Sequence, residues 1–181
     1  MENNVSKAEE QRYAELQRMA LDFAREGETG ELETMLQAGM PVNLADEKGN
    51  TLLMLASYYG EAGTVRMLLD FGADPDRRND RGQSPLGGVA FKGYTEVAEL
   101  LVEAGADIHA DNGAGMKPVH FAAMFGRFDI VRLLEERGTP LDGSGADAAG
   151  SPPSFGRRLM PAIARLVGRI RSFSPFANLG R

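Results

Sequence analysis

Few side chains in this sequence have the chemistry for catalysis or metal binding. The chain has two histidines, His109 and His120, and no cysteine. An imidazole can transfer a proton near neutral pH or ligate a metal ion, but a tight metal site needs several such ligands together. The chain also lacks a phosphate-binding loop, a dinucleotide fingerprint and a nucleophile elbow. We therefore expect no catalytic residue, no metal and no cofactor, and we predict that the protein is not an enzyme.

Large apolar side chains that recur just before glycines indicate another kind of site. Residues 56–60 read ASYYG, residues 89–93 read VAFKG and residues 122–126 read AAMFG. The alanine of each stretch suits a core position, which leaves the larger side chains for a different contact. Exposed aromatic rings with a charged rim are typical of surfaces that bind proteins.

These stretches belong to a repeat of 33 residues. Three series of glycines share this period in one register: Gly49, Gly82 and Gly115; Gly60, Gly93 and Gly126; and Gly39, Gly72, Gly105 and Gly138. Each unit begins with a turn-rich stretch, continues with a short apolar segment that a glycine ends, and closes with a segment that has apolar residues at helical spacing. A period of this length predicts stacked structural units.

The repeated segments resemble ankyrin repeats. Residues 117–123 read KPVHFAA, residues 84–90 read SPLGGVA and residues 51–57 read TLLMLAS, which approximate the family's T-P-L-H-x-A segment. The resemblance implies an all-α solenoid, in which each unit is a hairpin turn plus two antiparallel helices. The short chain looks like small bacterial ankyrin proteins with a single domain.

The period also predicts the domain boundaries. Residues 1–12 would extend an N-terminal capping helix that a capping box of Ser6 and Glu9 opens, and Tyr13, Leu16, Ala20 and Phe23 would share one face of it. The ankyrin domain would cover residues 13–142, in units of about 13–45, 46–78, 79–111 and 112–142. A flexible linker, residues 143–154, and a basic amphipathic tail, residues 155–181, would follow.

Tandem glycines, Gly87 and Gly88, stand inside the short apolar segment of the third unit. Each costs about 1 kcal/mol relative to alanine in a helix. Either the neighbouring repeats tolerate this loss, or the backbone here closely approaches another group for a functional reason.

The resemblance implies which residues face a partner. In ankyrin proteins the first helix of each unit lines a concave face and the hairpin tips project beside it. The predicted binding set is Arg25, Glu26, Glu47, Lys48, Asn50, Tyr58, Tyr59, Asp80, Arg81, Gln83, Phe91, Lys92, Met116, Met124 and Phe125.

The tail has the pattern of an amphipathic helix with an apolar and a basic face. Its residues of interest are Arg158, Leu159, Ile163, Arg165, Leu166, Val167, Arg169 and Ile170. Such a helix could fold back on the repeats, bind a partner protein, or lie on an anionic membrane surface.

Charge separates the tail from the rest of the chain. The net charge is −6, and residues 143–181 contribute +5 through six arginines and one aspartate, so the first 142 residues carry −11. An acidic body disfavours binding to nucleic acid. The N-terminus has no signal-peptide pattern and no apolar run spans a membrane, so we expect a cytoplasmic protein that is a monomer when alone.

We predict a non-enzymatic protein–protein interaction module, an accessory or regulatory protein that binds another protein through its groove and hairpin tips. One alternative is a peripheral membrane adaptor anchored by the tail. Another is an immunity protein or an enzyme helper.

Overall fold

The computed structural model describes residues 6–138. These residues form eight α-helices and no strand, and the helices make four antiparallel pairs. The pairs are α1 (Lys7–Glu26) with α2 (Thr29–Gln37), α3 (Leu52–Tyr59) with α4 (Ala62–Asp70), α5 (Pro85–Lys92) with α6 (Thr95–Glu103), and α7 (Pro118–Met124) with α8 (Phe128–Glu136). The prediction of an all-α repeat solenoid is confirmed. The predicted linker and tail helix lie outside the described residues.

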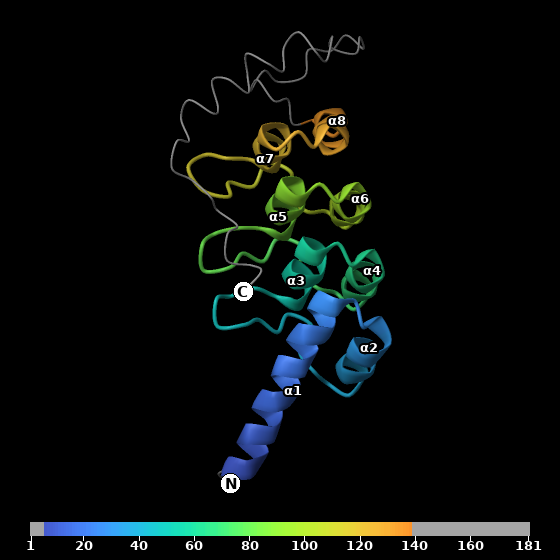
Figure 1. Cartoon of the computed structure of the whole chain (residues 1–181), viewed down its shortest axis with the longest axis vertical. Helices are drawn as coiled ribbons and strands as arrows, with labels where there is room; N and C mark the ends of the chain where they lie inside the picture. Colours follow the sequence, from blue (N-terminus) through green and yellow to red (C-terminus); the bar gives the residue numbers. More distant parts are fainter. Residues whose placement is uncertain (1–5, 139–181) are drawn as a thin grey trace.

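The pairs stack in sequence order and form two columns (Figure 1). We call α1, α3, α5 and α7 the inner helices, and α2, α4, α6 and α8 the outer helices. The hairpin loops project from the inner column, on the side away from the outer helices. A single antiparallel bridge, between Ala45 and Thr51, closes the first of these hairpins.

The capping box predicted for α1 is confirmed. The Ser6 Oγ atom accepts a hydrogen bond from the Glu9 N–H at 3.3 Å, and the Glu9 Oε2 atom accepts one from the Ser6 N–H at 2.7 Å. The backbone N–H of Ser6 lowers the pKa of Glu9 most, because it donates to the charged carboxylate, and the Ser6 side chain lowers this pKa further. The helix ends at Gly27, which adopts a left-handed conformation with φ of 78°.

The short inner helices start and stop where the repeat pattern predicts. Thr51 caps α3 and Ser84 caps α5, each through its side-chain oxygen. Gly60 and Gly93 end these two helices with φ of 86° and 97°. Such conformations are strained for residues with a Cβ, which explains the glycine series. In the last pair, α7 stops one residue earlier, and Phe125 is its C-cap.

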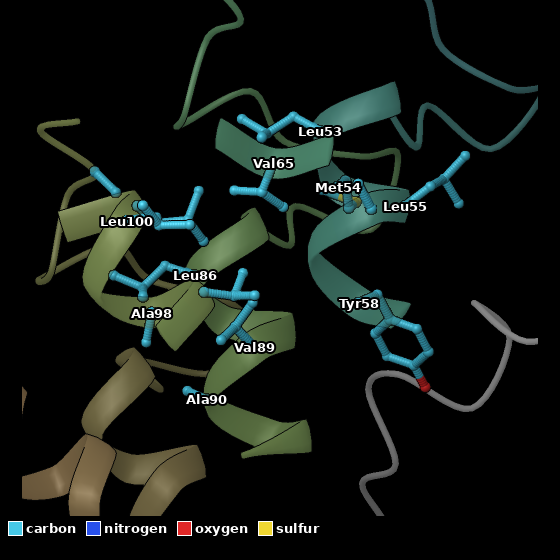
Figure 2. Close-up of a cluster of buried hydrophobic side chains, with 14 of the residues drawn as sticks. Leu53, Met54, Leu55, Tyr58, Val65, Leu86, Val89, Ala90, Ala98 and Leu100 are labelled. Carbon is cyan, nitrogen blue, oxygen red and sulfur yellow. The ribbon is translucent and has the colours of Figure 1, made fainter. Parts of the chain in front are cut away.

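The core lies between successive pairs. Leu53 and Leu55 of α3, Leu86 and Val89 of α5, and Val65 of α4 are fully or almost fully buried (Figure 2). The alanines before the helix-ending glycines, Ala56, Ala90 and Ala123, are buried as well, as the sequence predicts. The inner helices therefore use their small residues for stacking, and each pair depends on its neighbours for burial.

The backbone at Gly87 lies close to a side chain of the next repeat. The Asn112 side chain occupies the space that a Cβ on Gly87 would take. Its Oδ1 atom accepts hydrogen bonds from the Ser84 N–H at 2.7 Å and from the Ser84 hydroxyl at 2.9 Å. The group close to Gly87 is therefore a side chain of the protein itself, and this side chain connects two repeats. Gly87 is no sign of a bound ligand.

Candidate functional site

The predicted binding residues differ widely in exposure. Six are exposed and five are half-buried. The exposed ones are Glu26, Glu47, Lys48, Asp80, Arg81 and Phe125; the half-buried ones are Arg25, Tyr59, Phe91, Lys92 and Met124. The remaining four are buried, so our expectation that they face a partner is wrong: Asn50, Tyr58, Gln83 and Met116.

Asn50 is buried where two successive hairpins meet, and Gln83 is buried within the second of these hairpins. The Asn79 Nδ2 atom donates to the Asn50 Oδ1 atom at 2.9 Å and to the Gln83 Oε1 atom at 3.0 Å. The Asn79 Oδ1 atom accepts from the N–H groups of Arg81 and Gln83, each at 3.0 Å. A buried amide needs such partners, so these side chains serve the stack and are not available to a second protein.

Tyr58 and Met116 are buried by packing. Tyr58 has an exposed fraction of 9%, lies in the last turn of α3 (Figure 2) and belongs to the cluster of buried apolar residues. Burial raises the pKa of its hydroxyl, and the neighbouring Tyr59 and Tyr94 raise it further. Met116 has an exposed fraction of 4% and belongs to the same cluster of apolar side chains.

A row of accessible apolar side chains remains at the carboxyl ends of the inner helices. We call it the aromatic strip and define it as Tyr59, Phe91, Met124 and Phe125, with Lys92 at its side. The rings of Phe91 and Phe125 meet edge to face, with centroids 4.5 Å apart. Tyr59 makes the same kind of contact with Tyr58, at 5.7 Å. These contacts restrict the rings, so binding would cost little conformational entropy.

Lys92 connects the strip to the rings beneath it. Its Nζ atom lies 4.7 Å from the ring centroid of Tyr58 and 5.9 Å from that of Tyr94. Cation–π contacts of this kind hold a charged group over apolar surface. The result is an apolar surface with a fixed positive charge at its edge.

Sequence reasoning missed Tyr94, which is partly exposed next to Lys92. Its ring covers Gly60 of the preceding pair, just as Glu61 covers Gly27 and Arg127 covers Gly93. All three residues directly follow a glycine of the same series, at a spacing of 33. The place of Tyr94 in the 33-residue period, directly after a glycine, was the sequence signal that could have identified it.

The hairpin tips carry charges of both signs. Glu47 and Lys48 occupy one tip, and Asp80 and Arg81 occupy the next. The Asp80 N–H donates to the Lys48 carbonyl at 3.0 Å, so the two tips are fixed to each other. Charges on neighbouring rigid tips can select a partner by electrostatic complementarity.

Arg25 is less available than we expected, because two carboxylates hold it. Its guanidinium lies 2.6 Å from Asp22 and 3.7 Å from Asp46. Asp46 in turn accepts from the N–H groups of Lys48 and Asn50 inside its hairpin. Arg25 thus connects α1 to the first hairpin.

The long first helix exposes apolar side chains in its N-terminal part. Tyr13, Leu16 and Met19 are exposed, while Ala20 is buried and Phe23 is half-buried. The face predicted for Tyr13, Leu16, Ala20 and Phe23 is therefore buried only towards its C-terminal end. The N-terminal part of α1 extends beyond the stack (Figure 1), and the buried residues of α1 are Ala20, Leu21 and Ala24, near its other end.

The two histidines lie in different elements, His109 in a loop and His120 in α7. The Nδ1 atom of His120 accepts a hydrogen bond from the Lys117 N–H at 3.1 Å, which supports the first turn of α7. Burial lowers the pKa of His120, and the positive charge of Lys117 lowers it further. His109 lies in an exposed loop. Across residues 6–138, no group of three or more His, Asp or Glu side chains is placed to hold a metal ion.

Comparison with known proteins agrees with this geometry. The family model for ankyrin repeats (3 copies) matches residues 21–112 and again residues 64–144, which together cover more than half of the chain. This chain belongs to the ankyrin-repeat family. A stretch of 38 residues is also 55% identical to PA3287 of Pseudomonas aeruginosa, which is named for its ankyrin repeats. That stretch covers 21% of this chain and 22% of the relative.

Ankyrin repeats are generally protein–protein interaction modules, and the ankyrin fold is not an enzyme fold. In this ankyrin-repeat protein, none of the helices between residues 6 and 138 is long and apolar enough to cross a lipid bilayer.

Proposed function

We propose that this ankyrin-repeat protein binds a partner protein through the aromatic strip and the charged hairpin tips, as a non-enzymatic accessory or regulatory protein. The observation that carries the proposal is the strip itself, in which Phe125 has an exposed fraction of 39% although it contacts Phe91. Contiguous apolar side chains on a protein surface mark a contact site.

The two parts of the surface have different roles. The strip supplies aromatic area, which contributes most of the affinity at protein interfaces. The tips supply Glu47, Lys48, Asp80 and Arg81, whose charges at the rim set the association rate and the choice of partner. Because buried hydrogen bonds fix the tips and ring contacts restrict the strip, the surface is formed before the partner arrives.

The experiment compares two exposed phenylalanines on different faces. Phe125→Ala removes a ring from the strip, and Phe71→Ala removes one with a similar exposed fraction, 37%, at the end of the outer helix α4. The partner is first captured from the native cell by proximity labelling with the full chain. Its affinity for each purified variant is then measured by calorimetry.

We expect Phe125→Ala to weaken binding by about tenfold or more, as for a residue at an interface hot spot. We expect Phe71→Ala to leave the affinity within a factor of about two, because surface changes away from an interface have small effects. Thermal unfolding of both variants shows whether the fold is intact. Equal affinities of the partner for the two variants would contradict the proposal.

A further inference from the structure

The 33-residue period continues beyond the described residues. Residues 161–169 read PAIARLVGR, and residues 128–136, which form α8, read FDIVRLLEE. At a shift of 33, Ile163 matches Ile130, Arg165 matches Arg132 and Leu166 matches Leu133. The earlier outer helices α4 and α6 occupy the same frame, at residues 62–70 and 95–103.

Residues 161–169 match the outer helices at both their buried and their exposed positions. One buried position holds Thr64, Val97 and Ile130, and Ile163 follows in the frame; another holds Leu68, Leu101 and Leu134, and Val167 follows. An exposed position holds Arg66, Glu99 and Arg132, and Arg165 follows. Residues 161–169 therefore repeat the burial pattern of an outer helix.

The connection has the right length as well. Residues 71–94 join α4 to α6 and residues 104–127 join α6 to α8, so each connection has 24 residues. Residues 137–160 give the same length between α8 and the new segment. The inner-helix pattern does not recur in the sequence of this unit, because Leu159 stands where the period places Gly60, Gly93 and Gly126.

The last helix pair offers a surface that earlier pairs cover. Phe128, the first residue of α8, has an exposed fraction of 45%. Leu133 is half-buried, while Met67 and Leu100 at the same position of α4 and α6 are buried. Arg127 covers Gly93, but no described residue lies within 4 Å of a Cβ placed on Gly126. Met160 is 33 residues after Arg127 and is the counterpart that would cover it.

We propose that residues 161–169 dock on α8 as the outer helix of a fifth, incomplete repeat. The contact between the outer helices of the first two pairs, α2 and α4, shows how residues 161–169 would meet α8. The Oγ1 atoms of Thr29 in α2 and Thr64 in α4 lie 2.7 Å apart, across 35 residues. Phe128 and Ile163 are also 35 residues apart and occupy the equivalent positions of the repeat. The proposed docking therefore places the Ile163 side chain against the exposed Phe128 ring.

This inference is independent of the proposed binding function. The segment covers the outer end of the stack, next to Phe128 and Leu133. It supplies no inner helix, so the aromatic strip stays accessible to a partner. The basic side chains, of which Arg165 is one, face outward and give the acidic stack a positive end.

Engineered cysteines test the proposed contact directly, because the chain has no cysteine of its own. The test variant is Phe128→Cys/Ile163→Cys in the full chain. The positive control is Thr29→Cys/Thr64→Cys, since these side chains are in contact in the structure. The negative control is Phe128→Cys/Arg165→Cys, which moves the second cysteine to the opposite side of the same helix.

Under mild oxidation, we expect the test pair to form an intramolecular disulfide at a rate similar to the positive control and several-fold faster than the negative control. The bond is identified by mass spectrometry after proteolysis. Equal rates for residues 163 and 165 would mean an unspecific collision of the tail and would overturn the proposal. The proposal would also be overturned if only the positive control formed a disulfide, or if the test pair formed a disulfide only between two molecules.

A second measurement does not depend on crosslinking. Ile163→Asp and Arg165→Asp place the same carboxylate at two positions, one facing α8 and one facing solvent. We expect the first to lower the melting temperature of the full chain by a few degrees, because it would bury a charge, and the second to leave it nearly unchanged. Equal melting temperatures would contradict docking, and the proposed binding function would not be affected.

Discussion

Asn112 takes up the volume beside Gly87 that a larger residue at position 87 would need. The same position holds Met54 in the preceding inner helix and His120 in the following one. In the third unit, a side chain from the next hairpin replaces the missing one and bonds to the cap residue Ser84. The absent side chain in one repeat and the buried amide in the next are therefore parts of one contact.

This contact predicts opposite effects for two substitutions of glycine by alanine. Gly87→Ala should lower the free energy of unfolding by about 1–3 kcal/mol, because its Cβ would overlap Asn112. Gly63→Ala should raise it by about 0.5–1 kcal/mol, because Gly63 lies in α4 with ordinary space around it, and alanine is the better helix former. Urea denaturation followed by circular dichroism measures both. A loss of stability for Gly63→Ala equal to that for Gly87→Ala would contradict the account.

Ser57 predicts a stabilising substitution. Its Oγ atom is buried, and no described residue hydrogen-bonds to it. The same position of the other inner helices holds Ala24, Ala90 and Ala123, all buried. Ser57→Ala should therefore raise the free energy of unfolding by about 1 kcal/mol, because it removes a buried hydroxyl that lacks a partner.

The matched control for Ser57 is another buried serine whose hydroxyl is bonded. The Ser84 Oγ atom accepts from the Gly87 N–H at 3.2 Å and donates to Asn112. Ser84→Ala should lower the free energy of unfolding by about 1–2 kcal/mol, because it removes a helix cap and leaves buried groups unpaired. If both alanine variants were destabilised equally, the Ser57 hydroxyl would have to make a hydrogen bond.

His120 predicts how stability depends on pH. Its pKa is lowered in the folded protein, first by burial and then by Lys117, so the unfolded chain binds a proton more readily. Its contribution to stability is present above the usual histidine pKa of about 6.5 and is lost as the pH falls from there towards the folded value. We expect His120→Gln to lose less stability than the natural chain between about pH 7.5 and 5.5.

The comparison of these two chains isolates the imidazole, because their carboxylates are the same. Urea denaturation at each pH gives the two slopes, and nuclear magnetic resonance of the His120 ring gives its protonation directly. Identical slopes, or a ring that gains its proton at the usual pH, would show that burial does not disfavour the charged form.

The repeat frame could be predicted from the sequence because glycine positions specify it. Gly60 and Gly93 end helices with positive φ, and that backbone requirement is visible in the residue type itself. The capping box of Ser6 and Glu9 is equally local, since both partners lie within one helical turn.

The accessible surface could not be predicted in the same way, because burial depends on distant residues. Asn50 follows a charged hairpin tip, but Asn79 of the next unit donates a hydrogen bond to it and it is buried. Tyr13 and Leu16 have helical spacing typical of a packed face, yet that part of α1 extends past α3. Amphipathic spacing predicts a face but does not specify a neighbour for it.

The adjacent tyrosines of α3 predict a separation of stability from binding. Tyr58 is buried at the end of the core and Tyr59 is half-buried in the aromatic strip, although their rings contact each other at 5.7 Å. Tyr58→Ala should lower the free energy of unfolding by about 3 kcal/mol, as for other large buried rings. Tyr59→Ala should lower it by about 1 kcal/mol, since less of its area is buried.

For the affinity towards the partner protein, we expect the opposite order, with Tyr59 more important than Tyr58. Among molecules that remain folded, Tyr59→Ala should weaken binding by about tenfold, because it removes an accessible ring from the strip. Tyr58→Phe keeps the buried ring and removes only its hydroxyl, so it should bind within a factor of about two of the natural chain. Calorimetry below the melting temperature of each variant measures the affinities. If Tyr58→Phe weakened binding as much as Tyr59→Ala, the Tyr58 hydroxyl would have to reach the partner, and the division between core and strip would be wrong.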